Sequence, residues 1–466
     1  MSLAVLTLVT FLVMTMLGYR FNQTDGSLVQ GGLVQFSSQP SNARVFINGN
    51  YINSTTNTKA TLQPGEHDIM LQRANYRDWK KQVDVRPGTV TWVNYARLVP
   101  EDLTPKQIRQ FDELDAALSS PDNKWFALLP DESKPDFVMA NIDRNEPEFE
   151  EISLPEGSFT AAPEDIQHNF KPVKWSSNGR HLIIEHSYGD NREWLVLDRE
   201  QPDEVRNITT LLNVNASQVQ FVDNSGKLFY VLDGSDVRRI NLDDATLSRP
   251  LISNVKSFRY ETGGDKLITY ESLPEDGKRH LGYFNDDNDD AAVVIRTVDD
   301  ASDAPLQIAI GEYYDETYTA LAIGDRVEIL KGDLPESDSV SSQKLIETID
   351  LSGEVRELKI RGGGRFVYAL SGATYTTYDL EQQSQYTTRL ATDEPAPRLN
   401  WLDEYIVWSD FGGKLQIYDF DGANHQEIAS VAPGYGVSLA RGGRFVYSIA
   451  QLDDGQFSLQ QVRLVL

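Results

Sequence analysis

A short phrase recurs through the last three-quarters of the chain and constrains its fold more than any other feature. It consists of an apolar or aromatic residue, a polar turn rich in Gly or Asn, a Lys or Arg, and a run of β-forming residues. Its basic residue falls at Lys124, Arg180, Lys227, Lys266, Arg365 and Arg444. Repetition at a period of roughly 40 to 50 residues indicates an array of small units.

Two of the intervals between these basic residues, of 99 and 79 residues, are each wide enough for one more unit. Degenerate copies start at Tyr313 and Trp401, which brings the number of units to eight. Four short strands per unit at this period are typical of a β-propeller. We therefore expect an all-β fold with a propeller over residues 120–466, with eight blades favoured and seven as the alternative. A pair of β-sandwiches is the competing architecture, but sandwiches lack so regular a repeat.

Several units also end an apolar strand on Asp directly before a turn. An Asp carboxylate in this place can accept hydrogen bonds from the backbone amides that follow it. The phrase resembles the Ser-Pro-Asp-Gly-Lys turn of TolB-like and WD-type propeller blades, most closely at 120–124 and 175–180. In that family the turn is structural, so the resemblance implies a fold and says nothing about activity.

The chain begins with an uncharged, mostly apolar stretch. As a helix, residues 2–19 would be about 27 Å long at 1.5 Å per residue, which barely spans a hydrocarbon core of ~30 Å. Cleavage as a signal peptide is the alternative, but the stretch has neither a basic leader nor a small-x-small cleavage site. We expect residues 1–19 to be a single-pass membrane anchor, with the bulk of the chain extracytoplasmic.

Residues 28–99 read as short strands separated by turns. They contain Ser-Gln-Pro-Ser-Asn-Ala-Arg-Val at 38–45, Ile-Asn-Gly at 47–49 and Pro-Gly-Glu-His at 64–67. This pattern resembles the PEGA domain, a small extracytoplasmic β module of bacterial membrane-anchored proteins. Asn75 stands where the family usually has Gly, a tolerable change because Asn also adopts left-handed backbone. The resemblance implies that His67 belongs to a structural turn.

The segment between the two modules carries helix signals. Thr104 suits a helix cap, Pro105 suits the first helical position, and apolar residues follow at 108, 111 and 114. We expect residues 100–119 to be a short helical connector, although 116–119 has the character of a first blade strand. The last unit ends abruptly, so we also expect a segment near 90–119 to complete the final blade and close the ring.

Charge and residue types exclude several functions. The net charge is −27, of which residues 20–99 contribute +4, leaving −31 for residues 100–466. An acidic domain repels phosphate backbones, so nucleic acid is not an expected partner. The chain contains no Cys, which excludes disulfides, thiolate metal sites and Cys nucleophiles.

The chain shows no catalytic sequence motif. His181 and His186 are the closest pair of the six histidines, but an odd spacing on a strand points them to opposite faces. The acidic loop 285–290 departs from a calcium loop because Ala291 and Thr297 stand where Gly and Glu belong. We therefore predict no catalytic, cofactor-binding or metal-binding residue and no cofactor, and we expect the loop to be a solvated insertion.

The predicted function is recognition, because propeller faces gather loops from every blade. We expect a membrane-anchored extracytoplasmic binding or scaffold protein of the bacterial cell envelope, whose partner is a protein or an envelope polysaccharide. The alternative is a propeller hydrolase or lyase acting on envelope carbohydrate, and enzymatic activity is left open. A basic and aromatic group in the PEGA-like module is the candidate binding surface, with ordinary strand surface as the alternative: Arg73, Tyr76, Arg77, Trp79, Lys80 and Lys81.

Overall fold

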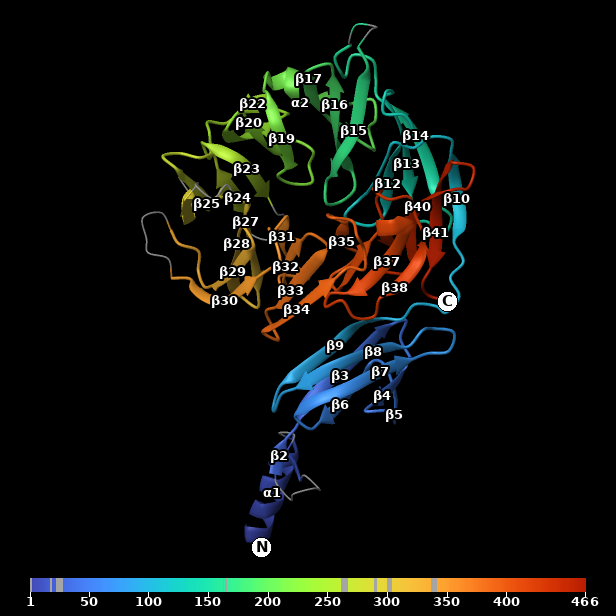
Figure 1. The fold of residues 1–466 in the computed structure, drawn as a ribbon, viewed down its shortest axis with the longest axis vertical. Coiled ribbons are helices and arrows are strands. Elements are labelled where there is room, and N and C mark those ends of the chain that lie inside the picture. Colours follow the sequence, from blue (N-terminus) through green and yellow to red (C-terminus); the bar gives the residue numbers. More distant parts are fainter. Residues whose placement is uncertain are drawn as a thin grey trace.

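The computed structural model describes residues 2–16, 19–21, 28–161, 163, 166–260, 267–288, 291–299, 304–336 and 342–466. Figure 1 shows three parts: an N-terminal helix, a small pair of sheets, and a ring of sheets. The helix and the small module lie on one side of the ring, and the C-terminus lies close to the small module.

The N-terminal part consists of α1 (Ser2–Met16) and a two-stranded sheet of β1 (Tyr19–Phe21) and β2 (Leu28–Gln30). Apolar side chains of α1 are exposed on several sides of the helix, among them Leu6, Leu8 and Met14. Among the described residues, none of the helices has the length and apolar character needed to cross a bilayer.

The small module has two sheets that enclose one hydrophobic core. The three-stranded sheet contains β6 (Thr58–Leu62), β3 (Gly32–Gln39) and β9 (Val90–Arg97) in that order. The four-stranded sheet contains β5 (Asn50–Thr55), β4 (Arg44–Ile47), β7 (Gly65–Gln72) and β8 (Trp79–Val85). Val34, Phe36, Val45, Leu71 and Trp79 are at most 1% exposed in the core between them.

Turn residues of the small module adopt the conformations that their types allow. Asn48 and Gly49 both have positive φ, of 49° and 78°, and join β4 to β5 as a tight hairpin. Asn75 has a φ of 66°, so it adopts the left-handed backbone expected at this position. The imidazole of His67 bonds the side chain of Asn48 and the carbonyl of Gln63, which agrees with a structural role.

The ring contains eight four-stranded antiparallel sheets in the described residues. The first sheet contains β11 (Ala116–Ser119), β12 (Trp125–Leu129), β13 (Asp136–Asn141) and β14 (Glu148–Ser153). The second contains β15 (His168–Trp175), β16 (His181–Tyr188), β17 (Asn191–Asp198) and β18 (Arg206–Asn207). The third contains β19 (Ala216–Phe221), β20 (Leu228–Asp233), β21 (Asp236–Asn241) and β22 (Thr246–Leu247). Helix α2 (Ile208–Leu212) follows β18.

The next sheets continue around the ring in chain order. They are β23 (Val255–Tyr260), β24 (Leu267–Ser272), β25 (Lys278–Asn285) and β26 (Val293–Asp299); β27 (Leu306–Tyr313), β28 (Glu316–Ile323), β29 (Arg326–Lys331) and β30 (Lys344–Asp350); β31 (Glu357–Arg361), β32 (Phe366–Ser371), β33 (Thr374–Asp379) and β34 (Ser384–Arg389); and β35 (Leu399–Trp401), β36 (Ile406–Ser409), β37 (Lys414–Asp419) and β38 (Gln426–Ser430). The two degenerate copies of the phrase therefore belong to complete sheets.

The eighth sheet combines the two ends of the propeller sequence. Its order is β10 (Lys106–Phe111), β41 (Phe457–Arg463), β40 (Phe445–Gln451) and β39 (Ser438–Ala440). The predicted closure by a segment near 90–119 is thus confirmed, whereas the predicted helical connector is wrong. Strand β41 offers a free edge of backbone donors and acceptors, and pairing with that edge outweighs the local helix signals at Thr104 and Pro105.

Apolar side chains fill each of the eight junctions between neighbouring sheets. Every junction has its own buried cluster with members from both sheets, including the junction between the eighth sheet and the first. At that last junction, Tyr447 and Leu459 pack with Phe126 and Leu128. The sheets therefore form a closed β-propeller, because no junction lacks a core.

Polar contacts also run from sheet to sheet around the ring. Each joins the first strand of one sheet, or a residue beside it, to the equivalent strand of the next, with β39 in this place in the eighth sheet. The pairs are Trp175 with Leu118, Lys174 with Gln220, Gln218 with Phe258, Arg259 with Gln307, Gln307 with Val355, Arg356 with Pro397, Arg398 with Tyr435, and Ser119 with Val437. This belt of hydrogen bonds ties all eight sheets together.

Candidate functional site

The recurring phrase forms the turn between the first and second strands of a sheet. In the copies that the structure describes, its basic residue immediately precedes the second strand and lies beside the end of the third; Lys266 lies outside the described residues. Arg180 donates to both carboxylate oxygens of Asp198, and Arg365 does the same to Asp379. The Arg365 and Asp379 side chains are 6% and 1% exposed. In these two copies the phrase holds its sheet together by a bidentate ion pair, which is a structural task.

The sheet β35–β38 departs from this arrangement. Tyr405 precedes its second strand, in the place of the Lys or Arg, while Asp419 lies opposite Ile406 at the end of the third strand. Asp419 accepts instead from Nε1 of Trp79 at 3.0 Å and from the amide of Asn424 at 2.8 Å. Tyr405 stacks on Tyr95, with ring centroids 5.4 Å apart. The sheet β35–β38, which contains the degenerate copy at Trp401, is therefore the place where the small module docks.

Further contacts surround this centre. Lys81 forms an ion pair with Asp421, and Arg97 forms one with Asp403 at 2.8 Å. The backbone of Lys80 exchanges two hydrogen bonds of 3.0 Å with the side-chain amide of Asn424. These contacts join the small module to the turns of the last three sheets, and together we call them the docking interface. Its outer contacts are Gln39 with Gly442, Arg77 with Gln426, Arg86 with Gln382, and Tyr76 with Leu466.

Burial changes the acid–base properties of two charged groups in the docking interface. It raises the pKa of Asp419 to about 6, although hydrogen bonds from Asn424 and Trp79 and the charge of Lys81 act in the opposite direction. It lowers the pKa of Lys81 to about 8, against the attraction of Asp419 and Asp379. Both groups remain charged at pH 7, and the interface holds them in a desolvated environment.

The structure places the six predicted surface residues at or beside the docking interface. Trp79, Lys80, Lys81 and Arg77 contact the propeller directly, and Tyr76 is buried and accepts from the backbone of Leu466. The guanidinium of Arg73 donates to the carbonyl of Ser41 and lies 5.3 Å from the Tyr76 ring. Binding of an external partner by these residues stays a prediction; their contacts in this chain are intramolecular.

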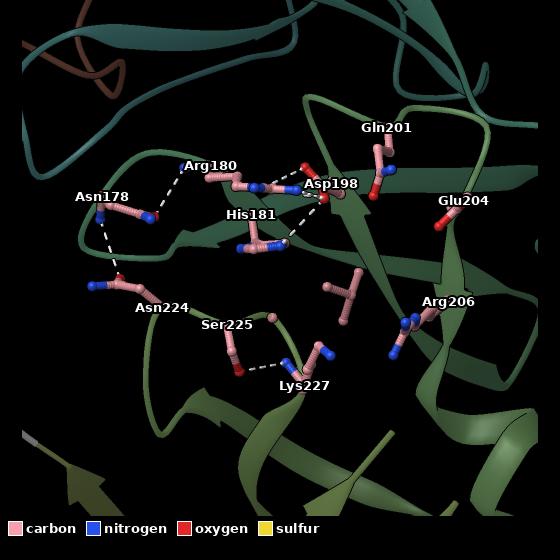
Figure 2. Close-up of a pocket in the computed structure, with 12 residues that line it drawn as sticks. Asn178, Arg180, His181, Asp198, Gln201, Glu204, Arg206, Asn224, Ser225 and Lys227 are labelled. Atoms are coloured by element: carbon pink, nitrogen blue, oxygen red, sulfur yellow. Dashed lines mark hydrogen bonds and ion pairs between the residues drawn. The ribbon is translucent and has the colours of Figure 1, made fainter. Parts of the chain in front are cut away.

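A pocket of about 320 Å³ lies between sheets β15–β18 and β19–β22, far from the docking interface along the chain (Figure 2). It is formed by two copies of the recurring turn, together with the β17–β18 loop. The lining residues are Asn178, Arg180, His181, Val196, Asp198, Gln201, Glu204, Arg206, Asn224, Ser225, Gly226 and Lys227. Two other pockets in the described residues are smaller, at about 70 and 30 Å³.

Charged groups of both signs line this pocket. Nη1 of Arg206 lies 2.7 Å from a carboxylate oxygen of Asp243, and Lys227 pairs with the other oxygen of the same carboxylate. Burial lowers the pKa of His181, partly opposed by the nearby charge of Asp198. The ring of His181 is therefore neutral at pH 7, and it lies against the turn at Gly226, where a Cβ would be only 2.3 Å from the ring.

A partly buried chain of hydrogen bonds links two histidines and a glutamate in sheet β15–β18. His168 Nδ1 and His186 Nε2 are 2.7 Å apart, and His186 Nδ1 lies 2.7 Å from Glu193. Burial alone would raise the pKa of Glu193, but hydrogen bonds from His186, Asn207 and Thr160 lower it to about 2. The part of the chain that the structure describes contains no group of three His, Asp or Glu able to hold a metal ion.

The histidine chain was missed from the sequence because strand pairing, and not spacing along the chain, brings its members together. His186 lies opposite Glu193 across a hairpin, while His168 lies on a third strand. The acidic loop shows a different arrangement, in which Asp286 accepts from Tyr230 and Arg239 rather than facing an ion site. The end of this loop, residues 289–290, lies outside the described residues.

The fold and the docking interface define a class of protein: a β-propeller that carries a small β module on its turns, an arrangement consistent with a binding or scaffold role. Residues 32–101 match the family described as the PEGA domain, so the small module is a PEGA domain. No curated protein matches the chain.

Solved structures similar to this chain have low sequence identity to it, and one of them is described as a propeller. The Dos1 propeller is 10% identical, with a TM-score of 0.47 over 77% of this chain and 96% of that one. Kluyveromyces lactis Hsv2 is 9% identical, with a TM-score of 0.41 over 76% of this chain and 99% of that one. A prolyl endopeptidase is 12% identical, with a TM-score of 0.47 over 74% of this chain and 53% of that one. At these scores the similarities carry no argument about function.

Proposed function

We propose that this chain is a membrane-anchored, extracytoplasmic binding protein of the bacterial cell envelope, whose eight-bladed propeller presents its turns to an envelope polysaccharide. The observation that carries the proposal is the docking of the PEGA domain at Asp419. The domain occupies turns of the last three sheets and leaves the turns of β15–β18 and β19–β22 open, with the pocket between them.

The N-terminal helix supports attachment to lipid. Apart from Thr10, its exposed side chains in the described residues are apolar, and Leu6 and Leu8 are 64% and 59% exposed. Exposed apolar surface of this kind is costly in water and favourable in a bilayer or its interface. The two-stranded sheet of β1 and β2 lies between this helix and the PEGA domain, and the PEGA domain docks on the ring, so an anchored helix would keep the propeller close to the membrane.

Co-sedimentation tests the binding role. The purified full chain in mild detergent is mixed with isolated envelope polysaccharide and, separately, with envelope polysaccharide whose carboxylates have been reduced. We expect the chain to sediment with the untreated polysaccharide. Protease shaving of intact cells tests the location, with digestion of the propeller expected. The chain staying in the supernatant, or protection of the propeller until cells are permeabilised, would contradict the proposal.

A further inference from the structure

The cationic side of the pocket is built from two sheets. Arg206 belongs to β18 and Lys227 to the turn that leads into β20, and both cations share the single carboxylate of Asp243. Their side chains are 38% and 50% exposed, so both remain within reach of a ligand. Two cations held beside one carboxylate leave one positive charge in excess on this side of the pocket, although residues 100–466 as a whole carry a net charge of −31.

The other side of the pocket carries unused polar groups. The side chains of Gln201 and Glu204 form no hydrogen bond or ion pair with any residue that the structure describes. Both lie on the loop that leads into Arg206 (Figure 2). An amide offers two donors and an acceptor, and a carboxylate offers only acceptors, so together they suit groups that both donate and accept.

These two sides define the chemistry of a ligand. A carboxylate is the natural partner of paired Arg and Lys side chains, and hydroxyl groups are natural partners of an amide beside a carboxylate. Val196 is the only large apolar side chain in the lining, which argues against an apolar ligand. Glu204 forms no ion pair in the described residues, so its charge disfavours a doubly charged phosphate more strongly than a singly charged carboxylate. The volume lies at the lower end of the range for small-molecule sites, roughly 300 to 1,000 Å³.

We infer that the pocket between sheets β15–β18 and β19–β22 binds a carboxylated sugar, with the sugar carboxylate at Arg206 and Lys227 and its hydroxyls at Gln201 and Glu204. This inference rests on the proposed function and names its ligand class. Binding at this place would bridge two sheets of the ring through one ligand.

Calorimetric titration of the full chain with galacturonic acid tests the inference, with galactose and acetate as matched probes. We expect saturable binding of galacturonic acid, at least tenfold weaker binding of galactose, which lacks the carboxylate, and at least tenfold weaker binding of acetate, which lacks the hydroxyls. Arg206→Gln and Lys227→Gln should each weaken the binding of galacturonic acid at least tenfold, and Glu204→Gln should weaken it several-fold. Arg326→Gln is the control, because Arg326 pairs with Asp350 at a distant surface position.

Several results would overturn the inference: no saturation by galacturonic acid, equal binding of acetate, or unchanged affinity in both Arg206→Gln and Lys227→Gln. Co-sedimentation separates this failure from failure of the proposed function. If Arg206→Gln sediments with polysaccharide as fully as the parent chain, the pocket is not the site although the proposed function stands. If the parent chain binds galacturonic acid but does not sediment, the pocket is supported and the proposed polysaccharide partner is wrong.

Discussion

Nε1 of Trp79, in the PEGA domain, donates a hydrogen bond of 3.0 Å to Oδ2 of Asp419, which lies 340 residues further along the chain in the propeller. In two other sheets the Asp at this position is bound by an Arg of its own sheet, as Asp198 is by Arg180. The sheet β35–β38 has Tyr405 instead of that Arg. A contact within one sheet has thus become a contact between two domains.

The first prediction concerns the indole donor. Trp79→Phe keeps an aromatic ring in the core but leaves the buried carboxylate of Asp419 without one of its donors. We expect the free energy of unfolding to fall by about 1.5–3 kcal/mol, the usual range for a hydrogen bond to a charged group. Chemical denaturation of the full chain measures it. Trp92→Phe, on the neighbouring strand β9, is the control, and equal losses in the two variants would contradict the assignment.

The second prediction concerns Tyr405, which replaces the basic residue of the phrase. Tyr405→Arg restores that residue and removes the stack on Tyr95. The new Arg competes with Trp79 for Asp419, so the PEGA domain should detach more readily while the ring stays folded. Limited proteolysis should then cut between β9 and β10 at least several-fold faster. Tyr314→Arg, at a 73% exposed position on another turn, is the control and should leave the cleavage rate unchanged.

The third prediction concerns Asp419 and pH. Its pKa in the folded chain is raised to about 6 from an ordinary value of 3.8, so its contribution to stability is present below pH 3.8 and is lost as pH rises through 6. Asp419→Asn removes this titration. The stability of the variant relative to the parent should therefore improve between pH 4 and pH 7, as measured by denaturation at several pH values. A relative stability that falls over this range would show that the carboxylate is favoured, not penalised, by its surroundings.

The fourth prediction concerns Glu193 and has the opposite sign. Hydrogen bonds lower its pKa in the folded chain to about 2 from 4.5, so its contribution is present above pH 4.5 and is lost as pH falls towards 2. We expect Glu193→Gln to reduce the loss of stability between pH 5 and pH 3. The exposed Glu354→Gln is the control. An acid-unfolding curve of Glu193→Gln that parallels that of the parent chain would refute the effect.

The ring could be predicted from the sequence because its units repeat. The basic residues of the phrase mark the turn after the first strand, and each run that follows is buried on both faces, as in β16 and β32. The closing strand β10 was also expected, but the same segment was assigned to a helix. The helix signals at Thr104 and Pro105 are local and contain no information about the open edge of β41. Pairing with that edge makes the segment a strand.

The docking interface and the pocket were not predictable in the same way. The exchange of a basic residue for Tyr405 was visible only as a degenerate copy of the phrase, and nothing in the sequence connects it to Trp79. The chain of His168, His186 and Glu193 depends on strand register, which brings residues 18 and 7 positions apart into contact. These sites arise from pairing between strands and sheets, whereas the repeat is a property of the chain itself.

The fixed docking of the PEGA domain on the propeller is the central claim, and a distance measurement tests it most directly. The chain contains no Cys, so spin labels can be placed on cysteines introduced by Tyr51→Cys in the PEGA domain and Tyr314→Cys in the ring, both at exposed positions. Pulsed electron paramagnetic resonance should give one narrow distance distribution, which broadens when Tyr405→Arg is added. A broad distribution in the doubly labelled parent would contradict the account.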